Sequence, residues 1–315
     1  MTVGYIEAGF RLFFFLLPVL LLIGCVGNRG QDLSFETPEG AIELIFSAAA
    51  DMRDFTGPNP DHFRGACERI AAGGAGSFMV SSGDIDPPSG VYEDLKTYIG
   101  SDYLWYPAAG NHEAETPSDM QWLRSYNAGG NTLQSVVNIG PSGSEETTFS
   151  FDYGNAHFVI LNEYFDGSSD VGTDGDIVTP LCDWLDNDLS VNPKPVIFVI
   201  GHEPAYPLAD EGSGRLRHEN DSLNKYGSRR DAFWALLETH GVKAYICGHT
   251  HNYSTEKFGS VWQIDVGHAR GTGDPGARST FVMFYLMADG ATWYYTYRLD
   301  LDEERYLLTD KGLIE

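Results

Sequence analysis

The chain has 315 residues, of which 42% are hydrophobic and 21% are charged. This apolar content is sufficient for a folded core and excludes an intrinsically disordered chain. Asp and Glu number 45 against 20 Lys and Arg, a formal net charge of −25, and because such an acidic surface repels phosphate, we expect no binding to nucleic-acid backbones.

The N-terminal segment contains an apolar run from Leu12 to Ile23, preceded by Arg11. The run has the length of the hydrophobic region of a signal peptide and is short for a membrane span, which needs about 20 apolar residues. We therefore expect residues 1–24 to be a signal peptide and the protein to be exported. Residues 25–41 are mostly polar and contain glycine, which is typical of a tether.

The end of this run reads Leu22-Ile23-Gly24-Cys25, which resembles the lipobox of bacterial lipoproteins. The resemblance implies cleavage before Cys25 and attachment of lipid to this cysteine, which would anchor a periplasmic or cell-surface protein to the membrane. An ordinary cleaved signal peptide and a tilted membrane anchor are the alternatives.

Residues 42–315 contain no internal repeat and no linker, so we expect one domain. Continuous apolar runs predict strands covered on both faces, and alternating polar and aromatic residues predict a half-buried strand. The predicted strands are 42–49, 77–82, 104–107, 147–153, 157–161, 195–200, 243–247, 280–286 and 292–297, and the predicted helices are 61–72 and 229–239. The early alternation of strands and helices, followed by an antiparallel hairpin, predicts an α/β layered sandwich with mixed sheets. Three long loops, 126–146, 166–176 and 205–227, are candidate functional segments.

Side chains that bind metal ions follow several of the predicted strands. Carboxylates, amide oxygens and imidazoles are ligands of hard and borderline metal ions. A position just after a strand places such groups at the carboxyl end of a sheet, where α/β proteins bind their substrates. In Gly-His-Thr-His, the two imidazoles are two residues apart and point the same way in an extended chain. The residues concerned are Asp51, Asp84, Asn111, His112, His202, His249 and His251.

The ordered motifs that carry these residues resemble the calcineurin-like metallophosphoesterase superfamily, which includes purple acid phosphatases and phosphoprotein phosphatases. The family pattern is D-x-H, G-D, G-N-H-[E/D], a His block and G-H-x-H, and the resemblance covers about residues 42–270. It implies a four-layer α/β/β/α sandwich of two mixed β-sheets and a centre of two metal ions, of Fe, Mn or Zn.

The resemblance also implies a role for each matching residue. The implied ligands of the first metal are Asp51, Asp84 and His251. Asp84 would bridge to the second metal, whose other implied ligands are Asn111, His202 and His249. His112 would remain unligated and face the leaving group of the substrate.

One position departs from the family pattern, because Arg53 stands where the family has a His ligand. A guanidinium group cannot bind a cation, and its charge disfavours one nearby. Purple acid phosphatases place a Tyr three residues after the G-D aspartate, but Pro87 occupies this position here. Three possibilities follow. The first metal has three protein ligands and water, or another residue such as His62 or Asp54 replaces the missing ligand. Otherwise the site works with one metal, and Arg53 contacts the phosphate of the substrate. We expect a weakened but occupied site, since open positions are normal at catalytic metals.

Hydrolysis of a phosphoester requires an activated water and neutralisation of the phosphoryl charge, and two metal ions supply both through a bridging hydroxide. His112 is suited to protonate the leaving group as a general acid, with Glu113 or Asp86 as candidates to orient its ring. The candidate substrate contacts are Arg53, Arg217 and His218, although an ion pair with Asp221 explains the last two equally well. His268 is a candidate for the rim of the pocket.

These features predict metal-dependent hydrolysis of a small phosphoester, with a monoester slightly favoured over a diester. The alternative is a non-catalytic surface lipoprotein that binds metal or phosphate and whose first metal site is degenerate at Arg53. His112 argues against this alternative, because a pure binding protein has no need of an acid at this position.

Overall fold

The computed structural model describes residues 1–2, 34–52 and 63–315. Residues 3–24 of the predicted signal peptide lie outside the described residues, and so do Cys25, Arg53, Asp54 and His62. The folded unit extends from Leu33 to Glu315. Within the described part of the chain, none of the helices combines the length and the apolar character that crossing a membrane would require.

The first sheet has six strands in the order β13-β12-β11-β1-β2-β3. Its parallel half consists of β1 (Ile42–Ala49), β2 (Phe78–Ser82) and β3 (Leu104–Ala108). Its antiparallel half consists of β11 (Thr280–Met287), β12 (Thr292–Asp300) and β13 (Arg305–Ile314). Every residue of β2 and β11 is buried, because both faces of this sheet are covered.

The second sheet has seven strands in the order β4-β5-β6-β7-β8-β10-β9. Its four central strands run parallel and are β6 (Ala156–Ile160), β7 (Val196–Ile200), β8 (Ala244–Cys247) and β10 (Val261–Val266). The antiparallel edges are β4 (Val136–Ile139) and β5 (Phe149–Tyr153) on one side and β9 (Tyr253–Phe258) on the other.

A layer of aromatic side chains holds the two sheets together. The ring of Phe46 on β1 lies 4.7 Å from Phe284, 5.1 Å from Phe158 and 5.2 Å from Phe198, measured between centroids. Phe46 and Phe284 belong to the first sheet and the other two rings to the second. Offset and edge-to-face contacts of this kind add to the free energy gained by burying the rings.

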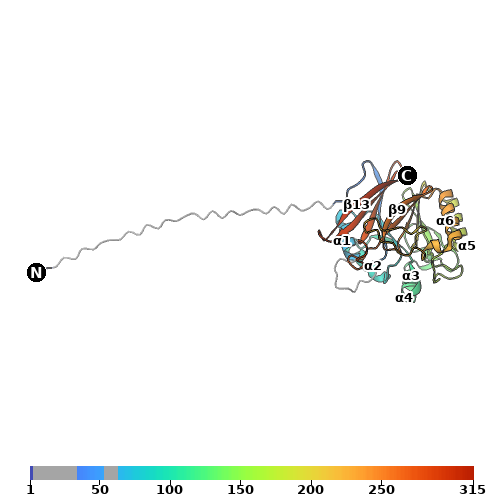
Figure 1. Cartoon of the computed structure of the whole chain (residues 1–315), viewed down its shortest axis with the longest axis horizontal. Helices are drawn as coiled ribbons and strands as arrows, with labels where there is room; N and C mark the ends of the chain where they lie inside the picture. The colour runs from blue at the N-terminus through green and yellow to red at the C-terminus, as the bar shows by residue number, and fades with distance from the viewer. Residues whose placement is uncertain (3–33, 53–62) are drawn as a thin grey trace. The chain divides into compact units, whose positions relative to one another are not determined.

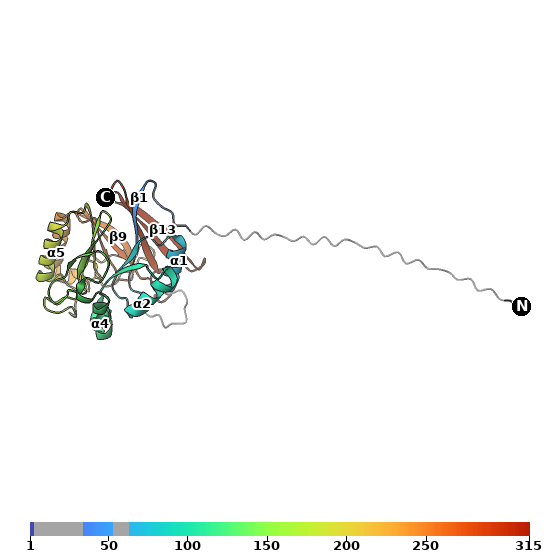
Figure 2. The same ribbon diagram turned by 180° about the vertical axis from the view of Figure 1, so that it is seen from behind.

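Helices cover the two outer faces, which completes four layers (Figures 1 and 2). The first sheet is covered by α1 (Phe63–Gly73), α2 (Pro88–Asp94), the π-helical turn Leu95–Ile99 and α4 (Pro117–Tyr126). The second is covered by α5 (Thr179–Val191) and α6 (Gly227–Thr239). The predicted α/β/β/α sandwich of two mixed sheets is thus confirmed. The remaining helical segments are α3 (Asn111–Glu115) and the 3-10 turns Ala128–Gly130 and Leu223–Tyr226.

The predicted loop 126–146 is wrong in part, since it contains a 3-10 turn and the edge strand β4. Residues of β4 alternate between half-buried and exposed, so the strand lacks the apolar run that marks a central strand. Helix α5 was also missing from the prediction, although Leu181, Leu185 and Leu189 recur at helical spacing and are buried.

Candidate metal centre

The predicted ligand residues come together at the carboxyl ends of the parallel strands. On the first sheet, Asp51 follows β1, Asp84 follows β2 and Asn111 follows β3. On the second sheet, His202 follows β7, and His249 and His251 follow β8. Because the sheets face each other across the aromatic layer, both sets of strands end at one edge of the sandwich, and six residues from five strands meet there.

His202 lies at the centre of one half of this cluster. Its Nε2 atom lies 3.2 Å from Nδ1 of His249, 3.3 Å from Oδ1 of Asn111 and 3.4 Å from Oδ1 of Asp84. These four atoms belong to the four residues expected to bind the second metal.

The hydrogen bonds made by the other nitrogen of each ring show which ring nitrogen carries no hydrogen. Nδ1 of His202 lies 2.6 Å from the carbonyl oxygen of Ser82, and Nε2 of His249 lies 2.7 Å from that of Asp221. A carbonyl oxygen accepts only, so each of these nitrogens carries the hydrogen. In the neutral rings, Nε2 of His202 and Nδ1 of His249 therefore point lone pairs at each other, an arrangement that a cation between them would satisfy.

The electrostatics of this pair also favour one positive charge. Burial opposes a charged His202, but the carboxylates of Asp84 and Asp51 raise its pKa to about 9. Burial and the neighbouring His202 lower the pKa of His249 to about 3. Without metal, the two rings thus carry one positive charge between them. The ligand atoms of the cluster fit a metal ion.

Asp51 forms the other half of the cluster with His251. Its side chain is fully buried, and Oδ1 accepts no hydrogen bond from the described residues. Nε2 of His251 lies 3.3 Å from this oxygen. Burial favours the neutral acid, but the nearby rings of His251, His202 and His249 hold the pKa of Asp51 well below its usual range. Asp51, Asp84 and His202 offer ligand atoms within 4.8 Å of one another, so a cation also fits where the two halves of the cluster meet.

The backbone at the predicted ligands is strained. Positive φ angles occur at Asp51 (53°), Asp84 (52°), His249 (68°) and His251 (58°). The left-handed region is unfavourable for residues other than glycine, and such strain persists where the surrounding structure fixes it, often at functional sites.

Two glycines make room for this geometry. A Cβ atom on Gly110 would lie 2.3 Å from both the backbone nitrogen and Oδ1 of Asp84, although its φ of −104° suits any residue. Gly83 has a φ of +78°, and a Cβ there would lie 2.6 Å from Nδ1 of His202. The glycine of the G-N-H motif is therefore required for close packing, whereas that of the G-D motif is required for its conformation as well.

His112 is partly exposed beside the cluster. Its Nε2 lies 3.6 Å from Oδ2 of Asp84, and its Nδ1 lies 3.7 Å from Oδ2 of Asp86. Asp86 is therefore the carboxylate that faces this ring. Glu113 faces the other way and is fully buried. Its carboxylate accepts hydrogen bonds from the backbone N–H groups of Asp84 (3.0 Å), Ile85 (2.9 Å) and Gly110 (2.8 Å).

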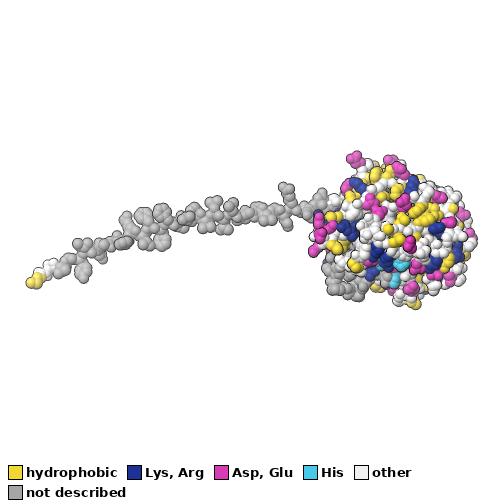
Figure 3. Space-filling model, viewed as in Figure 1, with side chains coloured by type: hydrophobic (Ala, Val, Ile, Leu, Met, Phe, Trp, Pro, Cys, Tyr) yellow, Lys and Arg dark blue, Asp and Glu magenta, His cyan; other side chains and the backbone are white. Residues whose placement is uncertain are grey.

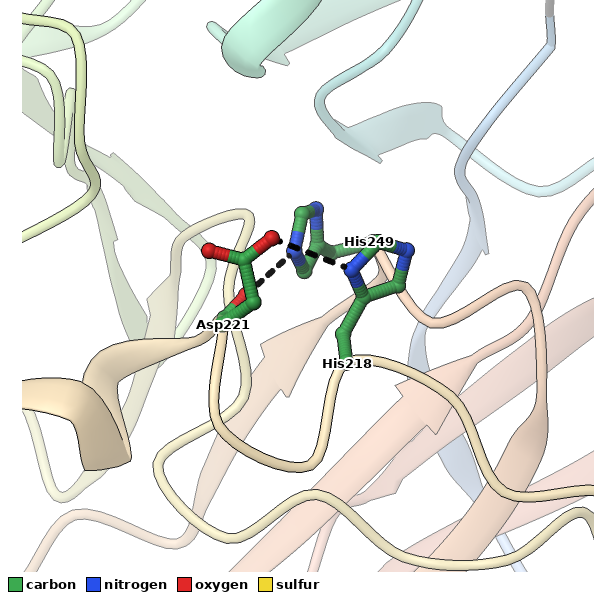
Figure 4. Close-up of side chains that lie close together, drawn as sticks. All are labelled: His218, Asp221 and His249. Carbon is green, nitrogen blue, oxygen red and sulfur yellow. Dashed lines mark hydrogen bonds and ion pairs between the residues drawn. The ribbon is translucent and has the colours of Figure 1, made fainter.

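A cavity of about 280 Å³ opens onto the cluster. Arg217 and His218 line it, as does Lys225, which the sequence did not suggest. His218 lies 4.2 Å from His249, measured between ring centroids, and its Nδ1 lies 3.5 Å from Oδ2 of Asp221 (Figure 4). His218 thus reaches the cavity and also forms the alternative ion pair. Arg217 pairs with Asp274 at 3.4 Å.

Two further observations concern the surroundings of the cavity. His268 is fully buried and hydrogen-bonded through both ring nitrogens, so the suggested role at the rim is wrong. On the face shown in Figure 3, histidine and basic side chains lie next to each other, while acidic side chains are scattered over the surface. Basic side chains are thus grouped locally on a protein of net charge −25.

Comparison with known proteins gives related sequences. The sequence model of the calcineurin-like phosphoesterase family matches residues 58–253. Purple acid phosphatase 21 of Arabidopsis thaliana is 25% identical over 251 residues, which are 75% of this chain and 50% of that protein. Tartrate-resistant acid phosphatase type 5 of Mus musculus is 33% identical over 69 residues, which are 22% of this chain and 17% of that protein. The chain thus spans half or less of the length of these relatives.

Solved structures share the fold. The structure of PhoD superposes with a TM-score of 0.59 at 10% identity and covers 87% of this chain and 70% of that one. GAP50, described as the anchor in the inner membrane complex of Plasmodium, superposes with a TM-score of 0.55 at 16% identity and covers 87% of this chain and 90% of that one. At such low identity, these similarities show the fold alone.

Proposed function

The chain belongs to the calcineurin-like phosphoesterase family, and from this premise we propose that it is a metal-dependent hydrolase of small phosphoesters. The main support is the convergence of ligand atoms from different strands: Nε2 of His202 lies 3.2 Å from Nδ1 of His249 and 3.3 Å from Oδ1 of Asn111. Imidazole nitrogens and an amide oxygen are metal ligands, and a cation placed among these three atoms would be bound by all of them.

We assign the two cation sites as the sequence predicts. Asp51, Asp84 and His251 form the first, and Asp84, Asn111, His202 and His249 form the second. Asp84 is suited to the shared position because it follows β2, which lies between β1 with Asp51 and β3 with Asn111. Its ligand atom also lies within 4.8 Å of those of both Asp51 and His202. Metal ions bound here would activate water and neutralise phosphoryl charge.

His112 is proposed as the general acid. It lines the cavity next to the cluster, and Asp86 faces its Nδ1. An imidazole held this way can present a proton from Nε2 to the oxygen of the leaving group. Arg217 and His218 line the cavity as proposed contacts for the phosphate oxygens.

A phosphomonoester is proposed as the preferred substrate. Arg217 and Lys225 line the cavity together with Glu115, Asp174, Glu203 and Asp221. Added to the charge of bound metal ions, the two cationic side chains would suit the dianionic charge of a monoester better than the single charge of a diester. Part of this charge is offset, because Asp274 pairs with Arg217, and Asp174 and Asp221 pair with Lys225.

The test is turnover by the purified protein with Mn²⁺, Zn²⁺ or Fe, using 4-nitrophenyl phosphate and bis(4-nitrophenyl) phosphate. We expect metal-dependent release of nitrophenol, faster from the monoester. Bound metal without turnover of either ester would instead support the alternative of a non-catalytic binding protein. Faster turnover of the diester would reject only the proposed preference.

Export and a lipid anchor at Cys25 are part of the same proposal. The support is the apolar run Leu12 to Ile23 and the lipobox-like sequence that ends it. Mass spectrometry of the mature N-terminus is the test, and an unmodified Cys25 would reject the anchor.

A further inference from the structure

The three imidazoles of the cluster differ in the group that contacts the ring nitrogen pointing away from the cluster. Those of His202 and His249 face backbone carbonyl oxygens, as described above. Nδ1 of His251 instead lies 2.7 Å from Oδ2 of Asp274. An anionic partner makes the opposite nitrogen of an imidazole a stronger ligand than a neutral carbonyl does. His251 is therefore the one of the three whose imidazole contacts a carboxylate through its second ring nitrogen.

Arg215 fixes this carboxylate and the backbone of the ligand together. Its Nη1 donates to Oδ1 of Asp274 at 2.6 Å, and its Nη2 donates to the carbonyl oxygen of His251 at 3.2 Å. Its Nε donates to Oδ1 of Asn252 at 2.9 Å. The planar guanidinium thus makes three hydrogen bonds whose relative directions are fixed, which limits movement of the His251 ring.

The loop that carries Asp274 is anchored next to Asp51. The backbone N–H of Ala269 donates to the carbonyl oxygen of Ala50 at 2.9 Å, so the loop begins beside the first site. His268 donates from Nε2 to the carbonyl oxygen of Ala277 at 3.1 Å and closes the loop from inside. These bonds explain the buried position of His268, and they bring Asp274 to His251 from 23 residues further along the chain.

Gly276 packs closely against Arg215. A Cβ atom on Gly276 would lie 2.1 Å from Nη1 and 2.9 Å from Cδ of Arg215. The backbone N–H of Gly276 also donates to Oδ1 of Asp274 at 2.9 Å. Glycine at this position therefore lets the loop close on both members of the pair.

We propose that Asp274 and Arg215 are positioning residues of the first cation site, which orient His251 on Asp51 and give the site the affinity it needs. This inference rests on the proposed two-cation centre. It also gives a physical reason why Arg53 in place of the family histidine need not empty the first site, since Asp274 holds the remaining imidazole in a fixed orientation and is itself contacted by Arg215 and Arg217.

The test measures Mn²⁺ binding to the full chain by titration calorimetry and by the electron paramagnetic resonance spectrum at two equivalents of Mn²⁺. For Asp274→Asn, which keeps the shape and removes the charge, we expect the first-site dissociation constant to rise by about 10- to 100-fold. The second site should change by less than about twofold, and the spectrum should change from that of a coupled pair to that of a single ion. Arg215→Lys should show the same selective loss.

A matched control is Asp186→Asn, because Asp186 also pairs with an imidazole, that of His240, at 2.7 Å on the surface. This variant should bind both ions as the original protein does. If Asp274→Asn fails to fold, as judged by its melting temperature without metal, Arg215→Lys decides.

Each outcome has a separate meaning. Two ions bound by Asp274→Asn or Arg215→Lys with unchanged affinities would overturn the inference and leave the proposed function intact. Equal weakening of both sites would also overturn it, since the effect would then be general. Fewer than two ions bound by the original protein would overturn the two-cation centre, and the inference with it.

Discussion

Glu113 lies on α3 after β3, Asp84 lies in the loop after the neighbouring strand β2, and the carboxylate of Glu113 accepts a hydrogen bond from the backbone N–H of Asp84 at 3.0 Å. The same carboxylate accepts from Ile85 and Gly110, so one buried side chain holds the loops that carry Asp84 and Asn111. The acidic residue of the G-N-H-E motif is thus a brace for the metal centre and does not contact the His112 ring.

Glu113→Ala should destabilise the protein. Three buried N–H groups would lose their acceptor, at about 1–3 kcal/mol each, so we expect the free energy of unfolding to fall by about 3 kcal/mol or more. Urea unfolding without metal measures this loss. Glu115→Ala on the same short helix is the control, because Glu115 is exposed, and a similar loss in both variants would contradict the bracing role.

His112→Ala should bind metal and lose turnover by about 10²- to 10⁴-fold, as expected for removal of a general acid. The loss should be larger for an alkyl phosphate than for 4-nitrophenyl phosphate, because nitrophenolate leaves readily without a proton. Parallel kinetics with both esters, together with metal content, provide the check. Equal losses for the two esters would assign His112 to binding and remove it from proton transfer.

Gly110→Ala should disturb Asp84, because the added methyl group would lie 2.3 Å from its backbone nitrogen and Oδ1. We expect weaker binding at both proposed cation sites, since Asp84 belongs to each, and a titration with Mn²⁺ measures it. Gly227→Ala is the matched control. Gly227 begins α6, and its Cβ would lie 4.0 Å from Nη2 of Arg230. Unchanged metal binding by Gly110→Ala would reject the packing argument.

The stability of the protein should depend on pH through His157. Its Nδ1 lies 2.8 Å from Oδ1 of Asp152 and its Nε2 lies 2.9 Å from Oδ2 of Asp188. Burial lowers the pKa of His157, but the two carboxylates outweigh burial and raise it above the usual value. A raised pKa means that the charged form stabilises the fold at pH values below about 6.5, the value in an unfolded chain. This contribution is lost as the pH rises through the raised pKa of the folded state.

Urea unfolding of the original protein and of His157→Gln at several pH values isolates this effect. The difference in unfolding free energy between the two should shrink as the pH increases from about 6 into the alkaline range. A difference that stays constant with pH would show that the fold does not raise the pKa of His157.

The sequence predicted the parts of the molecule that repeat a local pattern. A buried apolar run followed by a polar side chain marked β1, β2, β3, β7 and β8, and the direction of parallel strands then placed Asp51, Asp84, Asn111, His202 and His249 at one edge. Edge strands such as β4 were missed because half of their residues are exposed and the apolar run is absent.

Residues brought to the site by long loops could not be predicted. Asp274 and Arg215 contact each other from loops 59 residues apart, and neither loop has a period or a motif that indicates the contact. Lys225 was missed for the same reason. The need for glycine at position 110 also comes from a distant contact, because its φ is ordinary and only the close approach of Asp84 excludes a side chain.

The aromatic layer around Phe46 has a consequence for chemistry as well as for folding. Asp51, Asp84 and Asn111 leave one sheet, whereas His202, His249 and His251 leave the other. The phenylalanine side chains set the distance between the two sheets, about 10 Å in face-to-face packing. They therefore also set the distance between the strand ends that carry these two groups. A smaller side chain in place of Phe46 would bring the two sheets, and with them the two groups of ligands, closer together. The distances within the metal centre therefore depend on apolar residues that contact none of the ligands.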